Sequence, residues 1–332
     1  MAVRLKKLNK QVMVITGASS GIGLATARRA AASGAKVVLA ARNEGALSKV
    51  VAGIRAKGGT ATYVAADVSR RADVEKIADA AERSFGRIDT WVNDAGLSVF
   101  GRFDRITDAD ARTLFDINYW GLVYGTLVAA ERMRRTGGGC IVNLGSVASN
   151  VGLPLQSHYS ASKAAIRGFT DTVRMELTKE GAPIALSLIK PAAIGTPFAD
   201  HARNRTDSTP ALPPPVYRPE DVASSILHAA EHGERDYYVG GGARLFALAQ
   251  DLFPSLVDIA GARIMGPLST TNKYKPIRQA GSLDKPMEDG QERGRVPVPV
   301  QPALYTRSHP VATLAVVATG LLALVFTAKK AS

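Results

Sequence analysis

The chain has 332 residues, a formal net charge of +13 and one cysteine. This length suits one large domain plus a tail, and a single cysteine excludes an intrachain disulfide. No group of Cys, His and carboxylates has the spacing of a metal site, so we expect no metal. The lysines and arginines are dispersed and no recognition motif accompanies them. We therefore expect a basic surface that faces an anionic membrane, and no nucleic-acid partner.

Apolar, β-branched runs alternate with helical segments over about the first 240 residues. This alternation predicts a parallel sheet covered by helices. The expected strands lie at 11–16, 36–41, 61–66, 88–93, 139–145, 183–189 and 236–239. We expect a Rossmann-type, doubly wound α/β fold with a seven-stranded sheet and a long helix over about 157–180.

A glycine-rich turn, TGASSGIG at 16–23, connects the first strand to an alanine-rich helix. Glycines at 17, 21 and 23 allow a tight turn and a close approach of the backbone to a ligand. The helix that follows directs N–H groups and the positive end of its dipole at that ligand. The strand–turn–helix context predicts a dinucleotide pyrophosphate site. The alternative is a glycine turn that only packs a helix on a strand.

The end of the second strand bears on the choice of cofactor. An acidic residue binds the ribose 2′-hydroxyl at this place in NAD sites, whereas here Ala41 is followed by Arg42. A guanidinium suits a 2′-phosphate through charge-assisted bonds. We therefore expect NADP(H) rather than NAD; the alternative is that Arg42 is solvated and its neighbours decide.

The run GSVASNVGLPLQSHYSASK contains Ser146, Tyr159 and Lys163. Residues four apart share a helix face, so we expect Lys163 to lie beside Tyr159 and to lower the pKa of its phenol. Such a tyrosine can act as a general acid or base. Ser146 follows a strand, where it can hydrogen-bond a substrate oxygen. Alone, a Tyr-x-x-x-Lys pair is also common on exposed helix faces.

The order and spacing of these motifs resemble those of the classical short-chain dehydrogenases/reductases over roughly residues 8 to 240. The matching motifs are TGASSGIG, Asp67-Val68, Asn93-Asp94-Ala95-Gly96, Asn118, Ser146, Tyr159-x-x-x-Lys163 and Lys190-Pro191 with Thr196. Two positions depart from the family pattern. Asp94 stands where the family usually has Asn, and Ala192 follows Pro191 where the family often has Gly.

The resemblance implies a catalytic tetrad of Asn118, Ser146, Tyr159 and Lys163, with Tyr159 as the proton donor or acceptor. It implies hydride transfer between a nicotinamide and a carbonyl or secondary alcohol carbon. The glycine turn, Arg42 and the resemblance together give the expected cofactor-binding residues, which are Thr16, Gly17, Ser19, Ser20, Gly21, Ile22, Gly23, Arg42, Asp67, Val68, Asn93, Ala95, Gly96, Tyr159, Lys163, Pro191, Ile194 and Thr196. The alternatives are a non-catalytic NADP-binding scaffold or redox sensor, and an epimerase or dehydratase on the same scaffold.

The C-terminal third changes character twice. After the seventh strand, apolar residues recur at helical spacing with a break at Pro254, which predicts helices that cover the substrate mouth, lie on a membrane, or pack on the domain or a second subunit. Residues 266–309 are rich in Pro, Gly and charged residues, which predicts a disordered linker. Residues 310–328 carry no charge, which predicts a transmembrane tail anchor. We therefore divide the chain into an NADP-binding domain with a helical extension at 1–265, the linker and the anchor.

These features lead to expectations about location and partners. The N-terminus lacks a hydrophobic signal segment, so we expect a catalytic domain in the cytoplasm, tethered to the membrane by its C-terminal helix. The terminal lysines mildly oppose this orientation. The substrate is expected to be a small lipophilic carbonyl or alcohol, because apolar lining is expected from Val99, Phe100, Leu153, Leu155 and Phe198. The family often forms homo-oligomers through helices equivalent to 107–135 and 157–180; the oligomeric state, the substrate and the reaction direction stay open.

Overall fold

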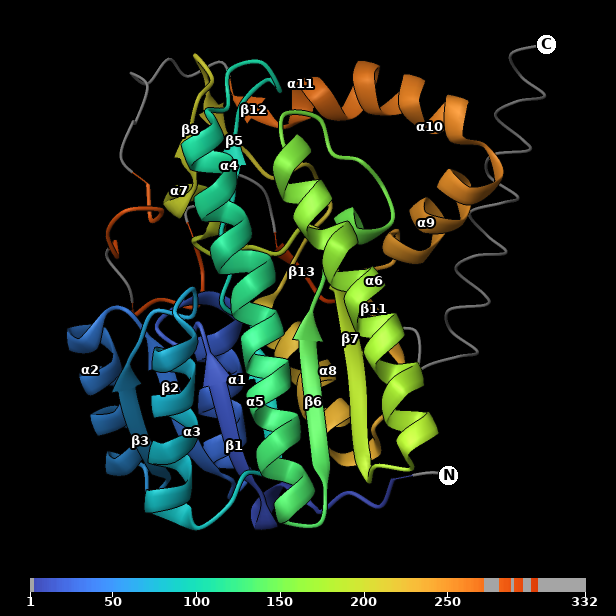
Figure 1. The fold of residues 1–332 in the computed structure, drawn as a ribbon. Coiled ribbons are helices and arrows are strands. Elements are labelled where there is room, and N and C mark those ends of the chain that lie inside the picture. The colour runs from blue at the N-terminus through green and yellow to red at the C-terminus, as the bar shows by residue number, and fades with distance from the viewer. Residues whose placement is uncertain (1–2, 272–280, 288–289, 295–299, 304–332) are drawn as a thin grey trace.

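A computed structural model describes residues 3–271, 281–287, 290–294 and 300–303. Its centre is a seven-stranded parallel sheet in the order β11-β7-β6-β4-β1-β2-β3 (Figure 1). The strands are β1 (Val12–Thr16), β2 (Lys36–Ala41), β3 (Thr60–Ala65), β4 (Thr90–Asn93), β6 (Gly139–Leu144), β7 (Ile184–Pro191) and β11 (Asp236–Val239). The predicted doubly wound sheet is confirmed. All residues of β1, β4, β6 and β7 are buried, as expected for strands covered on both faces.

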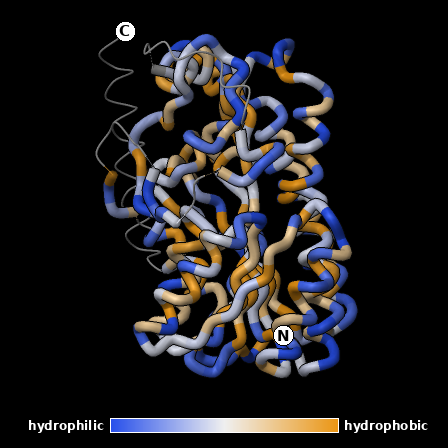
Figure 2. Tube along the Cα trace, turned by 90° about the vertical axis from the view of Figure 1, so that its left-hand side faces the viewer, coloured by the Kyte–Doolittle hydropathy of each residue, from blue (hydrophilic) through white to orange (hydrophobic). Residues whose placement is uncertain are grey.

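Helices cover both faces of this sheet in two layers. One layer contains α1 (Gly21–Ala32), α2 (Glu44–Ala56) and α8 (Pro219–His232), whose apolar residues share one core cluster. The other contains α3 (Arg71–Phe85), α5 (Gly121–Arg135) and α6 (Ser157–Glu180), packed in a second cluster around Trp91. Figure 2 shows the hydrophobic residues gathered along the sheet, with hydrophilic residues outside. The predicted long helix at 157–180 matches α6.

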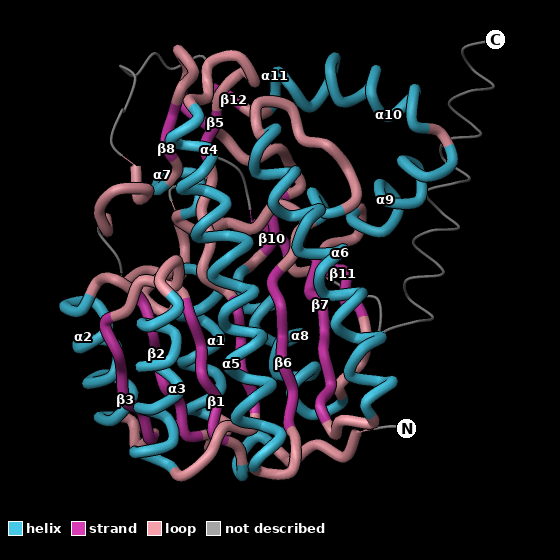
Figure 3. The backbone as a smooth tube through the Cα atoms, viewed as in Figure 1, coloured by secondary structure: helices cyan, strands magenta, loops and turns pink. Residues whose placement is uncertain are grey.

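The order of the strands reverses between β1 and β4, which are neighbours although β2 and β3 intervene in the chain. Ligands of doubly wound folds bind at such a switch point, beyond the carboxyl ends of the strands. Short elements surround this end of the sheet (Figure 3). They are η3 (Val147–Ser149), α4 (Asp108–Phe115), the π-helical η2 (Asp116–Trp120), α7 (Phe198–His201) and the paired strands β5 (Val99–Phe100) and β8 (Arg203–Asn204).

A helical arm follows the sheet. It consists of α9 (Ala243–Leu252), α10 (Pro254–Ala260), η4 (Gly261–Met265) and α11 (Gly266–Leu268), and it extends along the carboxyl-end side of the domain (Figure 1). Pro254 begins α10, where its missing N–H costs no helical hydrogen bond. The expected helical extension with a break at this proline is present.

The described residues of 266–309 differ from the disordered linker that composition suggested. They carry β12 (Thr270–Thr271), paired with β9 (Thr209–Pro210), and β13 (Val300–Gln301), paired with β10 (Val216–Tyr217). Leu283 is only 4% exposed and belongs to the second core cluster. The difference arises because this stretch is held through backbone hydrogen bonds and one buried leucine, which composition does not reveal.

The predicted membrane-spanning segment at 310–328 lies outside the described residues. Within the part of the chain that the structure describes, no helix is both long and apolar enough to cross a membrane.

Candidate active site

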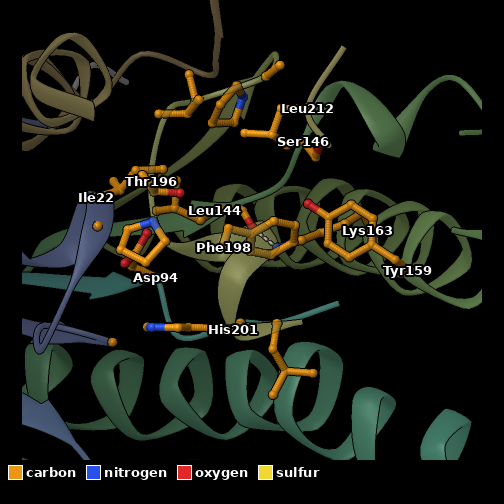
Figure 4. A pocket seen from close by; sticks show the side chains of 18 of the residues that line it. Ile22, Asp94, Leu144, Ser146, Tyr159, Lys163, Thr196, Phe198, His201 and Leu212 are labelled. Carbon is orange, nitrogen blue, oxygen red and sulfur yellow. Dashed lines mark hydrogen bonds between the residues drawn. The ribbon is translucent and has the colours of Figure 1, made fainter. Parts of the chain in front are cut away.

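A cavity of about 420 Å³ lies beyond the carboxyl ends of the central strands. Its lining includes the glycine loop after β1, the residues after β4 and β6, the start of α6 and the segment after β7. Figure 4 shows Ser146 and Tyr159 toward one side of this cavity, with Ile22, Asp94 and Thr196 toward the other. The fold therefore places the predicted proton donor and the predicted pyrophosphate loop in one cavity.

The Ser146–Tyr159–Lys163 group sits at the junction of β6 and α6. Ser146 follows β6 and caps η3, because its side chain accepts from Ala148 N–H at 3.1 Å. Tyr159 and Lys163 lie in the first two turns of α6, and both side chains are buried and line the cavity. The ring of Phe198 meets the Tyr159 ring edge-on, with centroids 5.4 Å apart. This contact fixes the phenol within the cavity.

The ionisation of Tyr159 differs from the sequence prediction. Burial raises the pKa of Tyr159 to about 12, and a hydrogen bond from Ser146 opposes this shift without reversing it. Lys163 was expected to lower this pKa, but its ammonium donates to the Leu144 carbonyl at 2.8 Å and lies 5.8 Å from the centre of the phenol ring. Desolvation by burial is therefore the largest influence on this pKa.

Asp94 and Lys163 influence each other's charge. Burial lowers the pKa of Lys163 to about 8, and the Asp94 carboxylate opposes this by favouring the ammonium. Burial raises the pKa of Asp94 to about 7, against the attraction of Lys163 and a hydrogen bond from Gly23 N–H. The carboxylate therefore lies at the N-terminus of α1 as well as near Lys163. Asp94, the first departure from the family motif, is a titratable group of this cavity.

Asn118 lies in η2, where the π-helical turn interrupts the path from α4 into α5. Turns of this kind often mark functional sites. Its side-chain amide exchanges two hydrogen bonds of 2.9 Å with the backbone of Leu97 and donates to Ser162 at 3.2 Å. A Cβ built on Gly96 would lie 3.3 Å from the Asn118 oxygen and 3.7 Å from the Lys163 ammonium. Asn118 thus braces the segment after β4 beside Lys163, and its side chain is buried behind the cavity wall.

The glycine loop fits a dinucleotide. Gly17 has φ +69°, and a Cβ there would lie 2.9 Å from the Ala95 backbone, so a side chain cannot be accommodated. A Cβ on Gly23 would lie 2.4 Å from the Gly17 carbonyl. Ser20, the N-cap of α1, makes no side-chain capping bond, and the first N–H of the helix, on Gly21, donates to the Gln291 carbonyl at 2.9 Å. Ser20, Gly21 and Ile22 line the cavity at the start of this helix. A close backbone approach joined to a helix N-terminus is the cradle that a pyrophosphate needs.

Most of the predicted cofactor residues line the cavity. They are Gly17, Ser19, Ser20, Gly21, Ile22, Arg42, Asp67, Val68, Ala95, Gly96, Tyr159, Lys163, Pro191, Ile194 and Thr196. Three others lie just behind it. Thr16 accepts from Asp94 N–H and Ala95 N–H, Gly23 permits the close contact above, and buried Asn93 donates to Asn143 at 2.9 Å. These three residues shape the walls rather than face the cavity.

Two parts of the lining lie outside the predicted site residues, although helices covering the substrate mouth were one expectation for the arm. The arm contributes Phe246, Ile264, Met265 and Leu268, and the stretch after residue 280 contributes Ser282, Pro286 and Met287. The helical spacing around Phe246 was a usable signal for the arm. The second stretch offered none. Of the five expected apolar residues, Leu153 and Phe198 line the cavity, and Val99 and Phe100 are buried in the core. The fifth, Leu155, is half-buried and lies outside the lining.

Comparison with known proteins agrees with this geometry. Residues 11–207 match the family model of the short chain dehydrogenases. The chain belongs to the short chain dehydrogenase family. The resemblance drawn from its motifs is thereby confirmed, and the protein is an oxidoreductase of a fold that binds a nicotinamide cofactor.

Individual relatives extend the similarity. An uncharacterized oxidoreductase of Bacillus subtilis, YxnA, is 43% identical over 333 residues, which cover 97% of this chain and 91% of that protein. An 11-beta-hydroxysteroid dehydrogenase A of Sesamum indicum is 38% identical over 236 residues, 68% of this chain and 67% of that protein. The first alignment spans nearly the whole chain, so its match continues beyond the family's matched region.

Two solved structures share the fold. A short chain dehydrogenase/reductase from Burkholderia phymatum in complex with NAD has a TM-score of 0.64 and 29% identity, covering 83% of this chain and 100% of that chain. An alcohol dehydrogenase from Thermococcus sibiricus complexed with 5-hydroxy-NADP has a TM-score of 0.58 and 26% identity, covering 66% of this chain and 89% of that chain. Both forms of the dinucleotide thus occur among its structural neighbours.

Proposed function

We propose that this protein is an NADP(H)-dependent oxidoreductase that transfers a hydride between the nicotinamide and a carbonyl or secondary alcohol carbon of a lipophilic substrate. One observation carries the proposal: Ser146, Tyr159 and Lys163 line the same cavity as the glycine loop. A proton donor and a dinucleotide cradle in one cavity suit this reaction better than a purely binding role, which needs only the cradle.

Each tetrad residue has a role consistent with its surroundings. The raised pKa keeps Tyr159 protonated at neutral pH, which suits donation of a proton to a carbonyl oxygen. Ser146 orients that oxygen, and the Lys163 ammonium stabilises the phenolate left after donation. Asn118 positions the backbone beside Lys163. The nicotinamide, when bound, supplies or accepts the hydride.

The preference for NADP(H) rests on Arg42. Arg42 lines the cavity just beyond β2, next to Asn43. The strand itself ends in alanine rather than in a carboxylate residue. Arg42 also donates to the Ser282 and Leu283 carbonyls, so Arg42→Ala should weaken the binding of both cofactors to some extent. The loss should be roughly tenfold or more greater for NADPH than for NADH, because only NADPH carries the 2′-phosphate. Titration of each cofactor by protein fluorescence measures both affinities. Equal losses for the two cofactors would contradict the assignment.

A lipophilic substrate is supported by the apolar part of the cavity lining. Apolar side chains come from Leu153, Phe198, Leu212, Phe246 and Ile264. The relative from Sesamum indicum is a hydroxysteroid dehydrogenase by name. An apolar wall beside a single proton donor favours a substrate with one reactive oxygen on a hydrocarbon body.

The proposed membrane attachment draws on the arm as well as on the uncharged run at 310–328. Eight large hydrophobic side chains between 246 and 268 are exposed, among them Leu252 at 67% and Leu256 at 64%. Such a concentration is typical of a surface that meets a membrane or a partner. We propose a cytoplasmic catalytic domain at 1–265, with the described part of 266–309 packed against it, and a membrane anchor at 310–328. Fractionation of the full chain and of a chain ending at residue 309 tests this, because only the full chain should sediment with membranes.

A homo-oligomer is also proposed. Trp120, Leu127 and Met175 expose large apolar side chains on η2, α5 and α6, the elements expected at a subunit interface. Light scattering of a chain ending at residue 309 should give a mass above that of one chain. Replacing Leu127 with Glu should lower this mass, since a buried charge would disfavour the interface.

The activity is tested by a screen of lipophilic ketones, aldehydes and alcohols with NADPH, NADH and their oxidised forms. At least one carbonyl should be reduced with NADPH. Replacing Tyr159 with Phe should abolish this turnover while leaving NADPH binding nearly unchanged, because only the proton donor is removed. Substantial turnover by that variant would refute the assignment of Tyr159. Tyr63 lies on β3, outside the cavity, and Tyr63→Phe serves as the matched control.

A further inference from the structure

A second segment of the chain closes one side of the cavity. We call residues 281–287 and 290–294 the strap; 288–289 lie outside the described residues. The strap follows the arm and stands well beyond the region that matches the family model, which ends at 207. It nevertheless contacts the residues assigned to the cofactor.

The first part of the strap lies against the end of β2. Arg42 donates to the carbonyls of Ser282 and Leu283, and Asn43 donates to the Met287 carbonyl at 3.2 Å. Ser282, Pro286 and Met287 line the cavity together with Arg42 and Asn43. The strap therefore forms the outer wall of the end of the cavity that the adenosine half of a dinucleotide requires.

The second part of the strap lies against the glycine loop. Gly290 N–H donates to the Ser19 carbonyl at 2.8 Å, and Gly21 N–H donates to the Gln291 carbonyl at 2.9 Å. These two hydrogen bonds run in opposite directions and hold the backbone of the strap beside the backbone of the glycine loop. Glu292 also pairs with Arg28 on α1. The strap is thus attached to the element that would bind the pyrophosphate.

Both ends of the strap are attached to the segment after β7. Ser282 N–H donates to the His201 carbonyl at 2.9 Å, and Gly294 N–H donates to the Gly195 carbonyl at 3.1 Å. A Cβ on Gly281 would lie 2.6 Å from Arg203 N, so glycine is needed for this approach. The strap crosses from one wall of the cleft to the other and is fixed on each.

We propose that the strap is a cofactor-binding element that holds the dinucleotide in the cleft, so that exchange of the cofactor requires the strap to detach. The inference rests on the proposed function. The strap bounds the cavity without filling it, because the glycine loop, Arg42 and Asp67 still line open space beneath it. Leu283, buried in the core, anchors it in place. Domains that end before this segment lack such a wall.

The test measures cofactor dissociation from the full chain. Protein loaded with NADPH is mixed with excess NADP⁺, and the loss of NADPH fluorescence gives the dissociation rate. Leu283→Ala removes the buried anchor and Gly281→Ala disturbs the close approach to Arg203. Each should speed dissociation about tenfold or more, since the constraint acts mainly on the exit rate. Circular dichroism confirms that the variants are folded.

Matched controls come from the arm. Leu256→Ala removes an exposed leucine, and Gly261→Ala adds a methyl group where nothing lies within 4 Å. Both should leave dissociation unchanged. Hydrogen exchange supplies a second readout: peptides covering 281–287 and 290–294 should exchange more slowly with NADPH bound, because the strap is then held closed.

The outcomes separate the two proposals. Equal dissociation rates in the unmodified chain and the strap variants, or tighter binding in the variants, would overturn the strap assignment while the proposed function stands. The strap assignment would also be overturned if NADPH left the hydrogen exchange of the strap peptides unchanged or made it faster. Failure of the unmodified protein to bind either NADPH or NADH would overturn the proposed function itself.

Discussion

The residues at the carboxyl ends of the central strands and the strap line the same cavity, but the sequence specifies these two regions in different ways. Beyond the carboxyl ends of the central strands, Tyr159 and Lys163 are one helical turn apart and the glycine loop spans eight residues, so local geometry determines this part of the site. In the strap, Arg42 contacts a carbonyl 241 residues away, through an atom that every residue possesses. Chemistry that depends on local spacing is visible in a sequence, whereas a wall built from backbone contacts becomes visible only in the fold.

The largest expected effect is the loss of NADPH affinity when the glycine loop is changed. Gly17→Val should weaken NADPH binding by about a hundredfold or more, because the residue has φ +69° and its Cβ would collide with the Ala95 backbone. Fluorescence titration measures the affinity. Gly53→Ala is the control, since a Cβ there meets nothing within 4 Å. Near-normal binding by Gly17→Val would show that the loop is not the cradle.

The second prediction compares the stability of the two regions. Leu39, in β2, is fully buried, and Leu39→Ala should lower the free energy of unfolding by about 2–5 kcal/mol. Leu283→Ala should lower it by less than about 1 kcal/mol, because the strap can detach without unfolding the sheet. Urea denaturation of both variants measures the difference. Equal losses would mean that the strap is part of the cooperative core.

The third and smallest effect concerns Asp94. In the unmodified enzyme, carbonyl reduction should decline as pH rises through about 8, where Lys163 loses its proton. The ionised Asp94 carboxylate raises the pKa of Lys163, so Asp94→Asn should move this decline to lower pH. The dependence of kcat on pH measures the shift. Asp104→Asn, a change at an exposed carboxylate, should leave the decline in place, and a shift to higher pH in Asp94→Asn would contradict the coupling.

Much of the fold follows from the sequence because strands covered on both faces need uninterrupted apolar runs. The predicted bounds 36–41 and 236–239 are those of β2 and β11. The fourth strand begins at Thr90 rather than at 88, where the carboxylate of Asp89 accepts from Val12 N–H and pairs with Lys6 and Arg87. Side-chain bonds of this kind alter the ends of elements without altering their existence.

The site was predicted best where residue type and local spacing suffice. Burial raises the pKa of Tyr159, and this shift depends on the whole surrounding shell, which residue type and spacing do not reveal. The role of Asp94 was likewise left open by the sequence. Its relation to both Gly23 and Lys163 requires the arrangement of β4 beside α1 and α6.

The most direct measurement traces the hydride. NADPH carrying deuterium at the transferable C4 position is incubated with the enzyme and a carbonyl substrate identified in the screen, and the alcohol product is analysed by NMR. We predict one deuterium on the new carbinol carbon, because the proposed reaction transfers the hydride directly from nicotinamide C4 to the carbonyl carbon. A product that takes its carbinol hydrogen from solvent, or cofactor oxidation without any labelled alcohol, would contradict the account.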